Sequence, residues 1–269
     1  MRRVAGRQIL LIGVILLSVA APLAPLLIWS FARQWFFPDL LPSSWSLRAW
    51  RYLFSAAAQT GAALGNSLRV AAAVTALAVV IGLPAGRALG LHEFRGKTAV
   101  LFLILAPTIM PVIAVAMGIH IAFIRFGLAD TYPGVVLAHL VPVLPYMVLT
   151  LTGVFANFDP DYEAQARSLG ARPLQVLRYV TLPAVWPGLM VGSLFAFIIS
   201  WSQYLLTLLI GGGQVVTLPV LLFAFANSGD NAITAALSLV FIAPALLFFV
   251  FTARHLTGRN TALGGLGKL

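Results

Sequence analysis

The stretch PGVVLAHLVPVLPYMVLTLTGVFA, residues 133 to 156, contains no charged side chain. A helix needs about 20 consecutive, mostly apolar residues to cross the hydrocarbon core of a bilayer. This stretch therefore predicts a transmembrane helix. The composition of the whole chain agrees, because 61% of its 269 residues are hydrophobic and only 9% are charged, whereas soluble domains carry about 25% charged residues. The expected fold class is an all-α polytopic membrane protein.

Five further apolar stretches have comparable length, so six transmembrane helices are expected in all. They are placed near residues 9 to 31, 67 to 90, 99 to 124, 133 to 156, 186 to 210 and 233 to 253. The first stretch follows three arginines and could also be a signal peptide, since SVAAPLA offers small residues for cleavage. Because the apolar run continues through PLLIWSF, a retained helix is the preferred interpretation.

The basic residues indicate how the chain is oriented, because Lys and Arg accumulate in the cytoplasmic loops of membrane proteins. With a cytoplasmic N-terminus, 12 of the 17 Lys and Arg residues fall inside and 5 outside. Both termini are therefore expected in the cytoplasm. The basic residues are scattered between apolar runs, so the net charge of +10 favours loop residues of a membrane protein over a nucleic-acid-binding segment. The absence of cysteine excludes disulfides and thiolate metal sites.

The predicted first external loop, residues 33 to 55, is rich in Trp and Phe. Its second half, from about Ser46 to Phe54, is expected to form a short amphipathic helix at the membrane interface, where amphipathic rings are favoured. Docking of a soluble partner on this loop is the alternative.

Residues 157 to 185 form a polar segment on the predicted cytoplasmic side. Asp159 can cap a helix that begins at Pro160. Glu163 and Arg167 are spaced i, i+4, which predicts an exposed ion pair on this helix. Gly170 is expected to end the helix in the left-handed conformation.

A second short helix is expected to begin at Pro173. Its apolar residues recur every three positions and form one stripe, made of Leu174, Leu177 and Val180. Leu182 and Pro183 are expected to stop this helix at the membrane surface. The two helices could be a surface-bound hairpin without a partner, or the first could enter a socket on a cytoplasmic protein.

This segment resembles the signature loop of the inner-membrane permease subunits of binding-protein-dependent ABC importers, written E-A-A-x3-G-x9-I-x-L-P. The matching positions are Ala166, Gly170, Val180 in place of isoleucine, Leu182 and Pro183. The position of the motif's glutamate holds Ala164, and Glu163 lies one residue early, which turns a helical side chain by about 100°. The resemblance implies that the matching residues, with Glu163 and Ala164, couple the permease to an ATPase.

Two further stretches resemble the same family: EFRGK, residues 93 to 97, and APTIMP, residues 106 to 111. The resemblance covers the chain and implies one MetI-like transmembrane domain over residues 1 to 269, with residues 157 to 185 as its coupling loop. It also implies a second permease subunit, in a homo- or heterodimer, and two cytoplasmic ATP-binding subunits that hold ATP and Mg. An external solute-binding protein would deliver the cargo. No cofactor is implied in this chain, and its location would be the inner membrane of a prokaryote.

Polar residues in the fifth apolar stretch mark a candidate translocation pathway. They are Ser200, Gln203, Tyr204 and Thr207. Ser200, Gln203 and Thr207 are spaced by three and four, so on one helix they would share a face. Hydrogen bonding between helices is the alternative role. His120 and His139 also lie within predicted spans, where packing against a neighbouring helix is the commoner role than a place in the pathway.

The chain resembles most the spermidine/putrescine, iron and thiamine group of permeases, which makes a polyamine-like cargo the first expectation and iron or thiamine the next. Three predicted external acids suit a cation: Asp39, Asp130 and Asp230. Four prolines are expected to interrupt the third and fourth spans: Pro107, Pro111, Pro142 and Pro145.

Two other classes of membrane protein remain as alternatives. A self-sufficient secondary transporter predicts internal symmetry and ionisable groups deep in the spans, and the sequence has neither clearly. A membrane enzyme predicts clustered catalytic residues, and neither HExxH nor GxSxG occurs. Gly90 and Gly96 have five residues between them instead of the four of a phosphate loop, so nucleotide is expected to bind a partner and not this chain.

Overall fold

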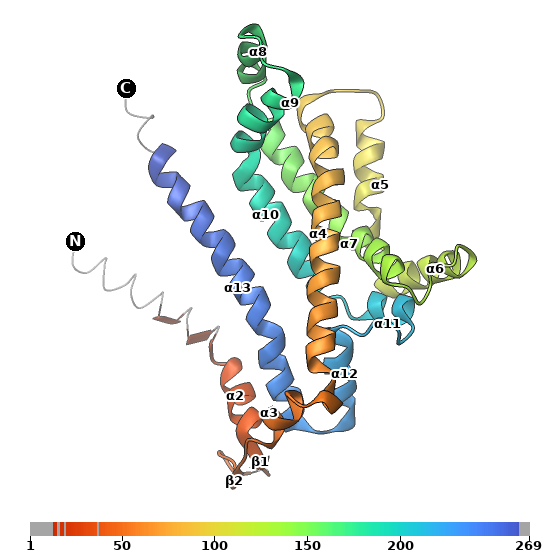
Figure 1. Ribbon diagram of the computed structural model, residues 1–269, viewed down its shortest axis with the longest axis vertical. Helices are drawn as coiled ribbons and strands as arrows, with labels where there is room; N and C mark the ends of the chain where they lie inside the picture. The colour runs from red at the N-terminus through yellow and green to blue at the C-terminus, as the bar shows by residue number, and fades with distance from the viewer. Residues whose placement is uncertain (1–12, 15–16, 19, 37, 264–269) are drawn as a thin grey trace, which may run out of the picture. The chain divides into compact units, whose positions relative to one another are not determined.

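The computed structural model describes residues 13–14, 17–18, 20–36 and 38–263, with side chains up to residue 253, and is mostly helical (Figure 1). Backbone contacts group the chain into two compact units. The first consists of Met1–Ala63 with Val220–Pro244, and the second of Leu64–Pro219 with Ala245–Leu269. The elements of each unit are given separately.

The first unit contains short elements. They are α2 (Leu23–Phe31), β1 (Ala32–Gln34), β2 (Ser44–Trp45), α3 (Arg48–Leu53) and the 3-10 turn η1 (Ala56–Ala58). The strands pair antiparallel, with Ala32 opposite Trp45. The short helix predicted in the first external loop is confirmed as α3, which buries Ala49 and Leu53. The two-stranded ribbon was not expected, because a pair this short has no recognisable alternation of apolar residues.

An ion pair joins two distant segments of the first unit. Arg48 Nη2 lies 2.8 Å from Asp230 Oδ2 and 2.9 Å from Asp230 Oδ1. Arginine is therefore already the partner of one of the three acids considered for a cationic cargo.

The second unit contains, wholly or in part, the long helices and several shorter ones. They are α4 (Thr60–Leu91), α5 (Lys97–Ile109), α6 (Val112–Arg125), α7 (Tyr132–Ala156), α8 (Asp161–Ser168), α9 (Pro173–Val176), the π-helix η2 (Leu177–Thr181), α10 (Leu182–Trp201), α11 (Leu205–Gly211), α12 (Leu218–Ser228) and α13 (Asn231–Leu263). Helix α4 begins in the first unit, α12 lies in the first unit from Val220 onward, and α13 is divided between the two at Pro244.

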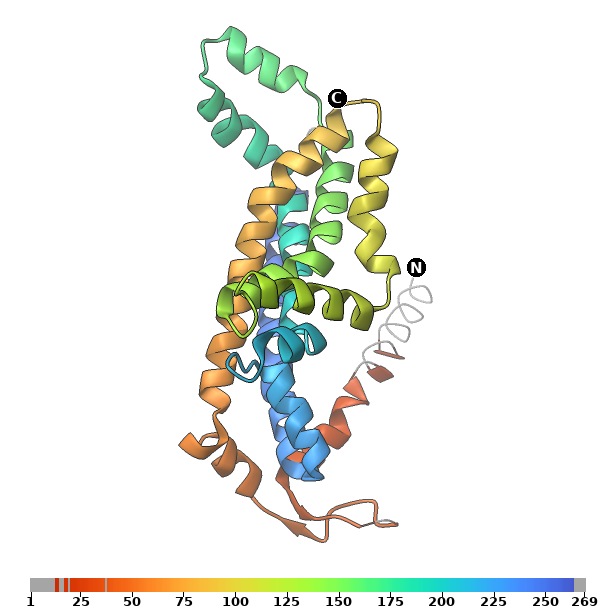
Figure 2. The same cartoon turned by 90° about the vertical axis from the view of Figure 1, so that its right-hand side faces the viewer.

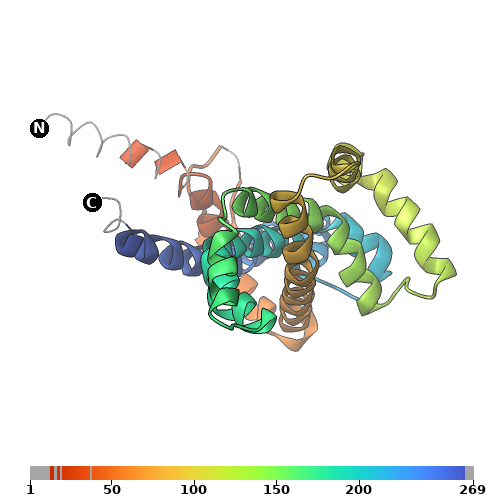
Figure 3. The same cartoon turned by 90° about the horizontal axis from the view of Figure 1, so that it is seen from above.

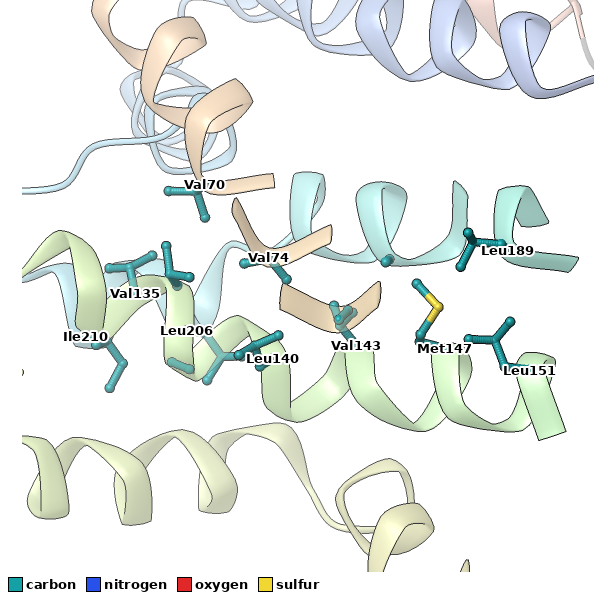
Figure 4. Packing of buried hydrophobic residues seen from close by; sticks show 14 of the residues in the cluster. Val70, Val74, Val135, Leu140, Val143, Met147, Leu151, Leu189, Leu206 and Ile210 are labelled. Atoms are coloured by element: carbon teal, nitrogen blue, oxygen red, sulfur yellow. The ribbon is translucent and has the colours of Figure 1, made fainter. Parts of the chain in front are cut away.

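Helix α7 is the centre of the second unit. Thr131 caps it, because its Oγ1 accepts a hydrogen bond from the Gly134 N–H at 3.1 Å. The helix packs mainly against α10, and also against α5, α6 and α11. Its buried side chains meet those of α4, α10 and α11 in one apolar cluster (Figure 4). Members of the cluster include Val70, Val74, Val135, Val143, Met147, Leu151, Leu189 and Leu206.

Glycines bring α4 close to α7. Gly82, Gly86 and Gly90 are spaced by four, so they lie on one face of α4. A Cβ atom at Gly86 would lie 2.5 Å from Leu151 Cβ, and one at Gly90 would lie 2.6 Å from Phe155 Cβ. Small residues at this spacing let two membrane helices approach closely. The sequence analysis did not use this signal, although the spacing is visible in GLPAGRALG, residues 82 to 90.

Among the described residues, four helices are long and apolar enough to cross a membrane, or up to five if a bent pair counts as one span. The bent pair is α5 with α6, which meet at 104°, and Figure 2 shows α6 leaving the end of α5 at this sharp bend. The third predicted span is therefore broken at Met110 and Pro111. The first predicted span lies partly outside the described residues, so the count of six stays a prediction.

The prolines act differently in the two predicted spans. Pro111 follows the end of α5 and precedes α6, so it interrupts the third span as expected. Pro107 lies inside α5, and Pro142 and Pro145 lie inside α7, and both helices continue through them. The prediction that these three prolines interrupt their spans is wrong. Neighbouring helices pack around α7 on several sides, and such packing allows a membrane helix to tolerate proline.

Candidate functional site

Helices α8 and α9 lie at one end of the second unit, away from α11 (Figures 1 and 2), and are nearest the viewer in Figure 3. Helix α8 begins at Asp161, one residue later than predicted, and Pro160 stands at its N-cap position. Asp159 Oδ1 accepts a hydrogen bond from the Asp161 N–H at 2.9 Å. Asp161 and Glu163 both lie in the first turn of α8, where the helix dipole favours negative charge.

Gly170 ends α8 as predicted, with a φ of 87°. The Gly170 N–H donates to the Arg167 carbonyl at 2.9 Å, and the Ala171 N–H donates to the Ala166 carbonyl at 3.1 Å. This pair of bonds defines a Schellman motif, which needs a left-handed residue at the position of Gly170. The turn is thereby fixed in the conformation that suits glycine.

The second helix begins at Pro173 as predicted, and the Arg172 N–H donates to Gln175 Oε1 at 2.7 Å. It does not end at Leu182 and Pro183. Helices α9, η2 and α10 follow one another without a break up to Trp201, so that prediction is wrong. Pro183 has no N–H to donate, and it lies directly after the π-helix, where the regular α-helical hydrogen-bond pattern is already interrupted.

The π-helix also changes which side chains are buried. Val176 and Thr181 are buried, and they are five residues apart, the hydrogen-bond spacing of a π-helix. Within the predicted stripe, Leu174 is 74% exposed and Leu177 is 37% exposed, while Val180 is half-buried. The two most deeply buried residues of this segment therefore lie outside the stripe.

Glu163 is buried, with 3% of its side chain exposed. Arg87 of α4 donates from Nη1 to Oε1 at 2.6 Å and from Nη2 to Oε2 at 2.7 Å. Arg167 donates to Oε2 at 2.9 Å, and Thr181 Oγ1 donates to Oε1 at 2.6 Å. The predicted pair of Glu163 with Arg167 is confirmed, but the expectation that this glutamate is exposed is wrong. Its main partner is Arg87, 76 residues earlier in the chain.

The surroundings of Glu163 stabilise its charged form. The hydrogen bonds from Arg87, followed by the bond from Thr181 and the charges of Arg87 and Arg167, lower the pKa of the carboxyl from 4.5 to about 2. Burial raises the pKa and is the second-largest single cause, after the hydrogen bonds from Arg87, but the hydrogen bonds and charges together exceed it. Glu163 is therefore ionised at neutral pH and has four donors on two oxygens.

The opposite side of this loop is exposed and partly apolar. A groove of about 380 Å³ runs along the junction of α8 and η2, and its lining includes Leu169, Gly170, Tyr179 and Val180. Leu169 is 89% exposed at the tip of the turn, and Tyr162 and Tyr179 are also exposed. Of the predicted coupling residues, Glu163 therefore faces the chain, while the turn at Gly170 faces outward.

The predicted pathway residues do not share one helical face. Helix α10 ends at Trp201 and α11 begins at Leu205, so a break separates Ser200 from Thr207. Both side chains are buried and converge on His139 of α7. Ser200 Oγ lies 3.0 Å from Nδ1, and Thr207 Oγ1 lies 2.9 Å from Nε2. The structure thus contains the interhelical hydrogen bonds that were the alternative for these two residues.

The hydrogen bonds assign the tautomer of His139. Thr207 Oγ1 donates its hydrogen to the Gln203 carbonyl at 3.0 Å, so it accepts from His139 Nε2–H. His139 Nδ1 then accepts from the Ser200 hydroxyl. The neutral ring therefore bridges the break between α10 and α11.

Gln203 and Tyr204 lie within this break and are half-buried. Gln203 borders a small apolar cavity that also includes Pro107, Val112 and Pro142. His120, in α6, has no hydrogen-bond partner for Nδ1 in the structure. Within the described part of the chain, no three His, Cys, Asp or Glu residues are close enough together to hold a metal ion.

Comparisons with known proteins agree with this architecture. The family model described as "Binding-protein-dependent transport system inner membrane component" matches residues 78–259. The molybdenum transport system permease protein ModB of Mycobacterium tuberculosis is 33% identical over 229 residues, which cover 80% of this chain and 86% of that protein. The putrescine transport system permease protein PotI of Escherichia coli is 29% identical over 255 residues, covering 90% and 87%. A chain in the crystal structure of a bacterial ABC transporter that imports alginate has a similar fold, with a TM-score of 0.71, 18% identity and coverage of 94% and 96%.

Proposed function

Because the chain belongs to the inner-membrane components of binding-protein-dependent transport systems, we propose that it forms one half of the translocation pathway in an ATP-driven importer. Such a component is a transport subunit, and ATP hydrolysis takes place in a separate subunit. The second half of the pathway would be another permease subunit, identical or related. Two cytoplasmic ATP-binding subunits would hold ATP and Mg, and an external solute-binding protein would deliver the cargo.

The observation that carries this proposal is the exposed turn between α8 and α9. Leu169 is 89% exposed beside Gly170, whose Schellman motif fixes the shape of the turn. Tyr162 and Tyr179 are exposed on the same loop. A rigid, partly apolar tip of this kind suits insertion into a cleft of a soluble subunit. We assign residues 157 to 185 as the coupling loop and the ATP-binding subunit as its partner.

Closure of the two ATP-binding subunits around nucleotide would displace both coupling loops. A ligand shifts an equilibrium between two conformations when it binds one of them better. Displacement of the loops would therefore favour one of the two states, inward-open or outward-open, by rigid-body movement of helices. The polar break around Gln203 and Tyr204 is our candidate for the wall of the pathway, since both residues are only half-buried.

The cargo is a small solute, with a polyamine-like cation as the first candidate and iron or thiamine next. The similar proteins carry the names of trehalose, molybdenum and putrescine systems, which are chemically unlike one another. The direct test uses the system's external binding protein, whose melting temperature is measured with putrescine, molybdate and trehalose. A rise with putrescine alone supports the first candidate, while a rise with molybdate or trehalose rejects it.

The coupling assignment is tested by co-purification of the tagged permease with its ATP-binding subunit. We expect wild type to retain the subunit and Leu169→Asp to lose it, because a charge would enter an apolar cleft. Gly170→Pro should also lose it, since the proline ring excludes a positive φ. Leu40→Asp is the matched control, because Leu40 is 90% exposed in the predicted external loop.

Retention by wild type and by Leu40→Asp, with loss in both loop variants, supports the assignment. Equal retention by Leu169→Asp and wild type rejects the turn as the contact. Failure of wild type to retain the subunit with or without nucleotide rejects the importer mechanism and favours a self-sufficient transporter.

A further inference from the structure

The carboxylate of Glu163 joins three helical segments that are far apart in the sequence. It belongs to α8, it receives two hydrogen bonds from Arg87 of α4, and it receives one from Thr181 at the end of η2. With 3% of its side chain exposed, it has no free surface for a soluble partner. Its geometry is that of an internal connection.

Arg87 is held on a close-packed pair of helices. Its neighbours on α4, Gly86 and Gly90, touch the α7 backbone and side chains so closely that a Cβ atom at either would overlap α7. The Arg87 guanidinium also lies over the ring of Phe155 in α7, 6.0 Å from the ring centroid. A bidentate arginine–carboxylate pair fixes orientation as well as distance. Movement of α8 is therefore resisted by α4 and α7 together.

Thr181 connects the same carboxylate to α10. It is 1% exposed and is the last residue of η2, directly before Leu182. Helix α10 then runs to the break at residues 202 to 204, where Ser200 and His139 meet. The path from Glu163 to the candidate pathway is thus one continuous helix. Short π-helical segments such as η2 often occur at functional sites.

We propose that Arg87 and Thr181 are positioning residues that hold α8 through Glu163 and pass its displacement to α4 and α10. This inference rests on the proposed function, because the displacement would come from the ATP-binding subunits. It assigns separate tasks to the two sides of the loop: the outer turn at Leu169 binds the partner, and the inner carboxylate transmits the movement. Loss of the inner contacts should leave binding intact and remove transmission.

The first experiment measures the attachment of α8 without any partner. The chain has no cysteine, so Leu169→Cys gives one spin-label site at the end of α8. In the purified full-length permease, Arg87→Met and Thr181→Val should each increase the mobility of this label. Arg95→Met is the matched control, because Arg95 is an exposed arginine in the other predicted cytoplasmic loop. Unchanged mobility in both Arg87→Met and Thr181→Val overturns the inference.

The second experiment measures transmission in the assembled importer, without the spin label and without knowledge of the cargo. The readout is the stimulation of ATP hydrolysis by the system's external binding protein, which requires communication through the permease. Three variants should retain the ATP-binding subunit: Arg87→Met, Glu163→Gln and Thr181→Val. In each, the stimulation of ATP hydrolysis should be at least about fivefold weaker than in wild type, which is the range of ordinary coupling between sites. Thr181→Ser keeps the hydroxyl and should restore it, whereas a merely space-filling role would not require the hydroxyl.

The outcomes separate the two proposals. Stimulation equal to wild type in the three variants overturns the inference and leaves the proposed function intact. Loss of the ATP-binding subunit from Glu163→Gln alone also overturns it, because the glutamate would then act in docking. Failure of wild type to bind the subunit rejects the proposed function, while the spin-label experiment still decides whether Arg87 and Thr181 hold α8.

Discussion

At the scale of single residues, a shift of one position changes the partner of an acid. Glu163 lies one residue before the position of the family's glutamate, and a helical residue turns the side chain by about 100°. The structure directs it to Arg87 instead of outward. Breaking a buried ion pair at one partner leaves an uncompensated charge, which is strongly destabilising. The network should therefore be sensitive to both mutation and pH.

The pH dependence follows from the lowered pKa of Glu163, about 2 against an ordinary value of 4.5. A depressed carboxyl pKa stabilises the folded state above 4.5, and this contribution is lost as the pH falls from 4.5 to 2. We expect the difference in melting temperature between wild type and Glu163→Gln to be constant above about pH 5 and to shrink below 4.5. Thermal unfolding in detergent at several pH values measures it, and a difference that grows on acidification contradicts the prediction.

The glycine contacts between α4 and α7 give a second residue-scale prediction. Gly86→Ala should lower the free energy of unfolding by about 1 to 3 kcal/mol, because the new Cβ would overlap Leu151. Gly153→Ala in α7 is the matched control, since nothing lies within 4 Å of its Cβ position. The control should be neutral or up to about 1 kcal/mol more stable. Equal effects of the two substitutions in thermal unfolding would contradict the packing argument.

At the scale of elements, two predicted spans are broken and their breaks have different causes. Pro111 accounts for the bend between α5 and α6, because the residue before a proline is disfavoured in the helical conformation. The break between α10 and α11 has no proline within it. There, Ser200 and Thr207 lie on opposite sides of the break and both bond to His139. The histidine of α7 thus connects the two helices.

Removal of His139 should loosen this connection. His139→Leu leaves the Ser200 hydroxyl without its acceptor in a buried site, which costs about 1 to 3 kcal/mol. Thr207 keeps its bond to the Gln203 carbonyl, so the loss is confined to one partner. His120→Leu is the control, because His120 Nδ1 has no hydrogen-bond partner in the structure. In thermal unfolding, the melting temperature of His139→Leu should lie well below that of His120→Leu. The reverse order would reject the bridging role.

At the scale of the whole molecule, the distribution of basic residues predicts which loops face the cytoplasm. Twelve of the 17 lie on the predicted inner side, which includes the loop that contains α8. The predicted first external loop contains most of β1 together with β2 and α3. Orientation in a membrane is set by charge and not by helix packing, so it needs a separate measurement.

The cysteine-free chain allows that measurement with a membrane-impermeant maleimide. Leu40→Cys should react in intact cells, and Leu169→Cys should react only after the membrane is opened. The two sites are matched, because these leucines are 90% and 89% exposed. Reaction of Leu169→Cys in intact cells would reverse the orientation and place the loop on the wrong side for an ATP-binding subunit.

Sequence by itself determined the features that depend on composition and on neighbouring residues. Long apolar runs predicted a membrane protein, and the centres of α4, α7 and α13 fall within predicted spans. A hydrogen bond from Asp159 at the start of α8, the left-handed Gly170 and the helix start at Pro173 agree with the prediction. Each is a local property, because a cap or a turn is formed by residues within about five positions.

Only the tertiary structure decided which distant residues meet. Arg87 and Glu163 are 76 residues apart, and His139 and Thr207 are 68 residues apart. No local pattern contains these pairs, since they exist only after α4, α7 and α10 pack together. The π-helix and the continuation of α10 through Pro183 also went against local rules. Packing energy from the surrounding helices outweighs such local preferences, which is why these features required the fold.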